Sequence, residues 1–153
     1  MGKSPKASHK PPKEVPVTDI SDRSTKIVFS FEYLDMNNSK YSFEELKDTR
    51  IEKQFHSDFH KKMKEYCEKS DFKKDLSEKY WKKRNHIHPI DWSDPQIRES
   101  CFTSLDKELM EQIKDDCWQL GINNNGFRIH GFFIGNVFYI VWLDPLHRLY
   151  PSK

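Results

Sequence analysis

Hydrophobic and polar residues alternate in separate parts of the chain, and this alternation predicts β-strands at both ends of a single folded unit. A period of two begins abruptly at residues 27–34 and returns at 118–122 and 127–134. Alternation of this kind is typical of strands with one buried face. Residues 137–143 are apolar on both faces. Such a run favours the middle of a sheet over its edge.

Between these strands the apolar residues recur every three or four positions, which predicts helices. One amphipathic helix is expected over residues 53–83, with an interruption near Ser70–Asp71, and a second over 103–115. Ser42 and Glu45 have the spacing of a capping box, so a short helix is expected to begin there.

The strand order defines the expected fold class. Turn sequences at 123–126 and at Gly135–Asn136 join the last three strands into an antiparallel meander. The first strand is expected to pair with the apolar last one. The prediction is an α+β fold with an N-terminal strand, helices, and a three-strand antiparallel meander, forming a four-stranded sheet with the helices on one face. Residues 1–25 contain four of the eight prolines and predict a flexible, basic, proline-rich tail, which leaves 26–153 as a single α+β domain.

Composition excludes several classes of protein. The chain has 153 residues, 33% of them charged, and no apolar run of the length that a membrane span requires, so no membrane association is expected. The three cysteines Cys67, Cys101 and Cys117 form no CxxC pair, which argues against a disulfide scaffold or zinc finger and favours the cytoplasm. These thiols are expected to be inert.

Charge is strongly segregated despite a net value of +2. Residues 50–84 carry twelve basic and seven acidic side chains, whereas residues 85–116 carry three and eight. The basic segment ends in Lys82, Lys83 and Arg84 beside Trp81, a combination that suits a nucleic-acid backbone. A solvated helix face that complements the helix dipole explains the same residues.

A second group of reactive side chains lies near the C-terminus. Arg128 and His130 are two positions apart on a predicted strand and therefore share one face. His147, Arg148 and Tyr150 follow the last strand. Histidine that accepts a proton and arginine that stabilises a phosphate are the groups needed for general acid–base cleavage of a phosphodiester. The alternative is a solvated sheet face and an ordinary loop in which Asp144 pairs with Arg148.

Residues 86–96 are expected to be irregular, because two prolines and two aspartates interrupt any helix. His86, His88, Asp91 and Asp94 in this segment suggest three metal ligands, with His130 or His147 completing a site. A structural loop in which Trp92 packs against the core explains them better, so neither a metal nor another cofactor is expected.

The order of elements resembles the RelE/ParE-type fold of bacterial toxins over residues 26–151. The segments FRIHGFFIGNVFYIVWLDPLHRLYP and HPIDW also resemble small uncharacterised bacterial proteins. In ribonuclease toxins, basic residues on an open sheet face hold RNA while the 2′-hydroxyl attacks the neighbouring phosphate. The resemblance implies Arg128 and Arg148 as phosphate clamps, His130 or His147 as acid or base, and Tyr150 as an orienting hydroxyl.

Two functions therefore remain open. The first is a cytoplasmic toxin-type endoribonuclease that acts on mRNA and is controlled by an antitoxin or another protein partner. The second is a non-catalytic interaction module that binds a protein partner or nucleic acid through the same sheet face and basic helix. Catalysis requires Arg128, His130 and residues 147–150 to converge at one cleft, whereas a binding module does not.

Overall fold

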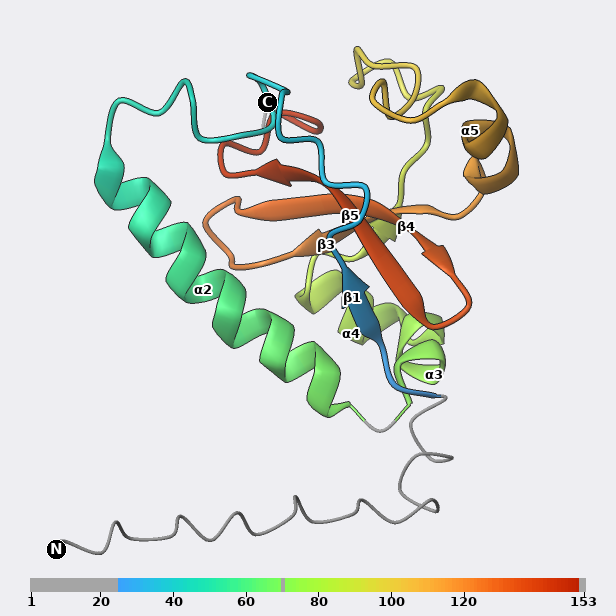
Figure 1. Ribbon diagram of the computed structural model, residues 1–153. Coiled ribbons are helices and arrows are strands. Elements are labelled where there is room, and N and C mark those ends of the chain that lie inside the picture. Colours follow the sequence, from blue (N-terminus) through green and yellow to red (C-terminus); the bar gives the residue numbers. More distant parts are fainter. Residues whose placement is uncertain (1–24, 70, 152–153) are drawn as a thin grey trace, which may run out of the picture.

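A mixed five-stranded sheet forms the centre of the protein in the computed structural model, which describes residues 25–69 and 71–151 (Figure 1). The strands run in the order β1-β5-β4-β3-β2. Their bounds are β1 (Val28–Ser30), β2 (His88–Pro89), β3 (Cys117–Gly121), β4 (Arg128–Ile134) and β5 (Val137–Asp144). β1 lies parallel to β5, and the other neighbours are antiparallel. The predicted meander and the predicted pairing of the first strand with the last are confirmed.

The prediction of four strands is wrong because the segment expected to be irregular contributes a fifth. His88 and Pro89 pair with Gln119 and Trp118 at the edge of the sheet. Proline lacks a backbone N–H, so an edge strand is the position in a sheet that tolerates it. The second predicted helix, expected over 103–115, is present as α5 (Lys107–Ile113).

Four helices occur in the described chain: α2 (Thr49–Glu68), α3 (Phe72–Ser77), α4 (Lys79–Arg84) and α5 (Lys107–Ile113). The expected long helix is thus divided into three, and its first break falls where the sequence predicted. The capping box at Ser42 and Glu45 does not form. The Glu45 carboxylate pairs instead with Arg148, and the side chain of Asp48 caps α2 by accepting from the Arg50 backbone N–H at 2.9 Å.

Helices cover both faces of the sheet, so the expectation of helices on one face is also wrong (Figure 1). Along β4, Ile129 belongs to the hydrophobic core formed with α2 and α3, whereas Phe132 belongs to a second core that contains residues of α5. The α2-side core includes Phe55, Phe59, Tyr66, Phe72, Leu120, Ile129, Phe138 and Ile140. The α5-side core includes Ile97, Phe102, Met110, Ile113, Phe132, Val141 and Trp142.

A β-bulge in β5 determines which side chains reach the α5 side. His130 lies opposite Trp142 and Gly131 lies opposite Ile140, which leaves Val141 as the additional residue. A bulge resets the alternation of side chains along its strand. Val141 and Trp142 therefore both belong to the α5-side core, although they are consecutive, whereas Ile140 belongs to the α2-side core.

Residues 1–24, which make up nearly all of the predicted tail, lie outside the described residues. Within the described part of the chain, no helix combines the length and the hydrophobicity needed to cross a membrane.

Candidate functional site

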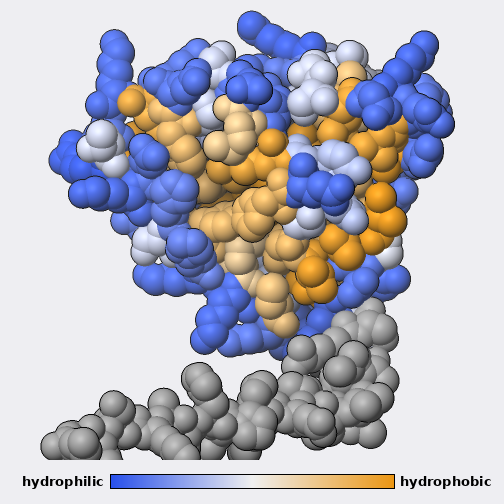
Figure 2. Space-filling view, in the orientation of Figure 1, coloured by the Kyte–Doolittle hydropathy of each residue, from blue (hydrophilic) through white to orange (hydrophobic). Residues whose placement is uncertain are grey.

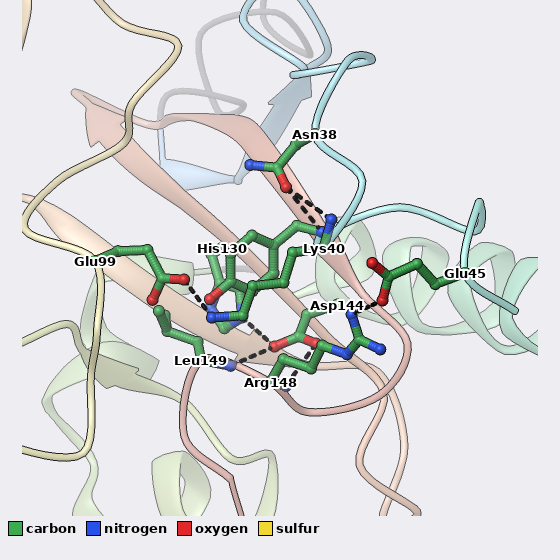
Figure 3. A network of polar contacts seen from close by, with 9 residues as sticks. Asn38, Lys40, Glu45, Glu99, His130, Asp144, Arg148 and Leu149 are labelled. Carbon is green, nitrogen blue, oxygen red and sulfur yellow. Dashed lines mark hydrogen bonds and ion pairs between the residues drawn. The ribbon is translucent and has the colours of Figure 1, made fainter.

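A buried histidine–aspartate pair joins the ends of β4 and β5 (Figure 3). His130 Nε2 donates to Asp144 Oδ2 at 2.9 Å, and both side chains are 0% exposed. Asp144 also accepts from the backbone N–H groups of Arg148 and Leu149, at 2.8 and 3.1 Å. Burial acts to raise the pKa of Asp144, but the bonds from His130 and the two amides outweigh it and hold that pKa below its ordinary value. The carboxylate thus anchors the C-terminal turn to the sheet.

His130 does not face solvent, so the expectation of an open sheet face around it is wrong. The Tyr41 ring lies edge-on to the imidazole at 6.1 Å and stacks on Trp142 at 4.2 Å. Tyr41 is itself 2% exposed, so the segment before α2 closes over this part of the sheet. A substrate therefore has no path to His130 in this conformation.

Arg148 and Tyr150 are directed away from each other. The Arg148 guanidinium pairs with Glu45, and only its backbone N–H reaches Asp144, so the expected ion pair between Asp144 and Arg148 is not formed. The Tyr150 hydroxyl accepts from the Asp91 backbone N–H at 3.2 Å. These two predicted site residues hold the C-terminal segment against different neighbours and do not meet at one cleft.

His147 and Arg128 are the two predicted site residues that do meet. They line a hollow of about 520 Å³ at the turn between β3 and β4. Arg128 is fixed there because its Nη1 donates to the carbonyl oxygens of Asn123 and Phe127 at 2.7 and 2.9 Å. Burial, followed by the charge of Arg128, lowers the pKa of His147, so its imidazole is neutral at neutral pH. A positive φ of 54° marks the His147 backbone as strained, a feature that accumulates at functional sites.

A second hollow, of about 300 Å³, adjoins the first. Its lining comes from α2, α4 and the two turns beside them: Lys62, Glu65, Lys69, Trp81, Arg84, Asn85 and Asn124. Asn124 also lines the first hollow, so its side chain forms a wall that the two hollows share. Together we call them the cationic groove. Across the described residues that line it, four side chains are Lys or Arg and one is acidic.

The cationic groove is held in shape by a small set of polar contacts. Lys62 Nζ donates to Asn85 Oδ1 at 2.6 Å and lies 3.2 Å from Glu65 Oε1. Asn124 Oδ1 lies 3.2 Å from Nε2 of His86, a residue that also has a positive φ of 54°. These contacts fix the wall between the two hollows and leave Arg84 exposed.

The predicted basic cluster on α4 is only partly included. Arg84 lines the cationic groove, whereas Lys82 and Lys83 lie on α4 outside both hollows. The sequence analysis missed Lys62 and Lys69. Their separation of seven residues, which is two turns of helix, was the available signal that they share one face of α2.

The proposed metal ligands do not assemble. Within residues 25–69 and 71–151, no three His, Cys, Asp or Glu side chains gather in a way that could hold a metal ion. His88 Nδ1 lies 2.8 Å from the Pro89 carbonyl oxygen, and its Nε2 lies 3.1 Å from the Gln119 amide nitrogen. The contact with Gln119 attaches β2 to β3.

A family model described as "Uncharacterised protein UU032" matches residues 30–153. The chain belongs to the UU032 family. No curated protein and no solved structure matches it. Every residue that lines the cationic groove, from Ile51 to His147, falls within the segment that the UU032 model covers. The groove thus belongs to the family domain.

Two kinds of chemistry fit the groove of this UU032 protein. Lysine and arginine side chains neutralise phosphate groups, and exposed asparagine amides donate to and accept from base edges. A neutral imidazole next to a guanidinium can in addition accept a proton while the guanidinium stabilises negative charge. The first property involves the whole groove, and the second involves only His147 and Arg128.

Proposed function

We propose that this UU032 family member is a binding module for single-stranded RNA. The observation that carries the proposal is the excess of cations in the cationic groove, whose lining includes Lys62, Lys69, Arg84 and Arg128 but one carboxylate, Glu65. A groove of one sign attracts a polyanion over long range and releases its counterions on binding. The strongly basic composition of residues 50–84 adds to this attraction.

The contents of the groove favour a single strand over a duplex. Trp81 is half-buried in the second hollow, with Lys69 Nζ 5.6 Å from its ring centroid, so an aromatic surface lies beside a cation. Asn124 and Asn125 are both exposed. Asn124 lines both hollows, and Asn125 lines the first. Unstacked bases use aromatic faces and amide groups of this kind, whereas a duplex hides its base faces.

Binding is better supported than catalysis because the predicted catalytic residues are separated. His130 is enclosed by Tyr41, and Tyr150 is bound to the backbone of Asp91. Only His147 and Arg128 share a hollow. The arrangement therefore lacks the convergence of acid, base and phosphate clamp that a metal-independent endoribonuclease needs.

One observation favours a toxin-type endoribonuclease as a second candidate. His147 is neutral at neutral pH and lies in the hollow with Arg128. Asn124 lines the same hollow and contacts His86. In that function His147 would take the proton of an RNA 2′-hydroxyl while the hydroxyl oxygen attacks the phosphorus of the adjacent phosphate. The 5′-oxygen would leave with a proton from His86, and Arg128 would stabilise the phosphorane charge.

Fluorescence anisotropy with a fluorescein-labelled 12-nucleotide RNA tests the binding function. The expected result is an affinity that falls with salt, with a slope of log K against log [salt] of about −2 for three phosphate contacts. The variant Lys69→Glu/Arg84→Glu should lose at least about tenfold in affinity. Arg98→Glu/Lys107→Glu makes the same change in net charge at exposed sites outside the groove and should retain most of it.

Equal losses in the two double variants would show that net charge, and not the groove, governs binding, and would overturn the proposal. Incubating the same RNA with wild type and with His147→Asn separates the two candidate functions. Cleavage that depends on His147 would establish the endoribonuclease, and intact RNA bound with unchanged affinity would reject it.

A further inference from the structure

A separate apolar pocket of about 420 Å³ lies between α2 and the chain that connects β1 to α2. Figure 2 shows the apolar band on this face, which runs from α2 across β1 towards the β4–β5 hairpin. The pocket is lined by Phe31, Leu34, Asp35, Met36, Tyr41, Ser42, Phe43, Glu52, Phe55, His56, Phe59, His60 and Leu143. None of these residues lines the cationic groove. Its size and its apolar character are those of a small-molecule site.

Five of the thirteen residues that line the pocket are Phe or Tyr. Phe55 and Phe59 are buried at its base, whereas Phe31 at the rim is 53% exposed and Met36 is 73% exposed. The Phe31 and Phe59 rings lie 6.2 Å apart, and the Phe43 and Phe55 rings 5.2 Å apart. Exposed apolar side chains next to a preformed aromatic cavity lose contact with water when a ligand enters, which favours binding.

Among Asp, Glu, Lys and Arg, only acidic residues line the pocket. Asp35 and Glu52 supply carboxylates, and no Lys or Arg lines the pocket although the chain contains 26 of them. Asp35 Oδ1 accepts from the Asn37 backbone N–H at 3.1 Å. Glu52 Oε1 lies 3.9 Å from His56 Nε2, too far for a strong hydrogen bond. Both carboxylates therefore keep free acceptor capacity.

We propose that this pocket binds an organic cation with an apolar body, namely an aryl or alkyl amine. The apolar body would occupy the space between the aromatic rings. The ammonium group would be attracted to the ring faces and to the carboxylates of Asp35 and Glu52. The cationic groove repels such a ligand, so the pocket and the groove select compounds of opposite charge.

NMR titration of the full chain with three probes of similar shape tests the proposal. The probes are phenethylamine, the neutral 2-phenylethanol and the anionic phenylacetate. Phenethylamine should bind about tenfold more tightly than 2-phenylethanol and should shift the resonances of Phe31, Met36 and Phe43, with phenylacetate binding most weakly. Comparable affinities for the three probes, or shifts located away from the pocket, would overturn the assignment.

Two double variants test the contribution of the carboxylates. Asp35→Asn/Glu52→Gln should remove most of the preference for the amine over the alcohol. The matched control Glu32→Gln/Glu44→Gln changes two exposed carboxylates outside the lining and should keep that preference. An unchanged preference in the first variant, with a well-dispersed spectrum that confirms folding, would contradict the role of Asp35 and Glu52. The comparison of the three probes on wild type does not depend on either variant.

Discussion

His130 Nε2 lies 2.9 Å from Asp144 Oδ2, and neither side chain has contact with solvent. This pair connects two neighbouring strands, and the same carboxylate accepts two backbone amides of the C-terminal turn. That turn carries His147 into the hollow where it meets Arg128. The buried pair therefore supports the cationic groove indirectly and is itself part of the folded framework.

Removing the carboxylate should weaken the fold. Asp144→Asn replaces a charged acceptor with an amide whose NH₂ group cannot accept from His130 or the turn amides. Leaving a buried donor without its acceptor costs about 1–3 kcal/mol, and bonds to a charged acceptor are the stronger ones, so we expect the free energy of unfolding to fall by about 3 kcal/mol in urea denaturation. His60→Asn, at an exposed position on α2, should change it by less than about 0.5 kcal/mol. A small effect of Asp144→Asn would show that the pair is not a structural anchor.

Stability should also decrease on mild acidification. Burial lowers the pKa of both His88 and His147 from the ordinary value of 6.5. The unfolded chain then binds protons at these sites as pH falls through about 6.5, while the folded chain does not, so the unfolded state gains. The free energy of unfolding is predicted to fall between pH 7 and pH 5. His88→Gln/His147→Gln should show a shallower fall in urea denaturation at pH 7, 6 and 5, and an equal slope would contradict this explanation.

The strand pairing was predictable because it follows from local hydrophobic pattern. The run at residues 137–143 is apolar on both faces and needs a partner on each side, which β1 and β4 provide. The break after α2 was predictable as well, since Ser70–Asp71 interrupts the amphipathic period. Asp71 caps α3 by accepting from the Lys74 backbone N–H at 3.0 Å.

The environment of the predicted site residues was not predictable, because it depends on contacts distant in sequence. Alternation places Arg128 and His130 on one face but does not tell whether a loop covers that face. Tyr41, almost ninety positions earlier, provides the cover over His130. Similarly, nothing near Arg148 in sequence indicates that Glu45 is its partner.

The bulge in β5 makes a glycine necessary on the opposing strand. A Cβ atom added at Gly131 would lie 2.0 Å from the Tyr139 carbonyl oxygen, whereas one at Gly135 would meet no atom within 4 Å. Because the clash is with backbone, Gly131→Ala should lower the free energy of unfolding by about 3 kcal/mol. Gly135→Ala, strained only by its positive φ of 61°, should lower it by about 1 kcal/mol. Thermal denaturation of the two variants tests the order, and its reversal would contradict the bulge geometry.

An NMR titration of isotope-labelled protein with the 12-nucleotide RNA tests the central claim most directly, because it locates the binding surface. The account predicts that the largest shifts occur at the Trp81 indole N–H, the Asn124 side-chain amide and the backbone of residues 123–128, with little change in α5. Shifts concentrated on α5 or on the apolar pocket, or no shifts at an RNA concentration well above that of the protein, would contradict it.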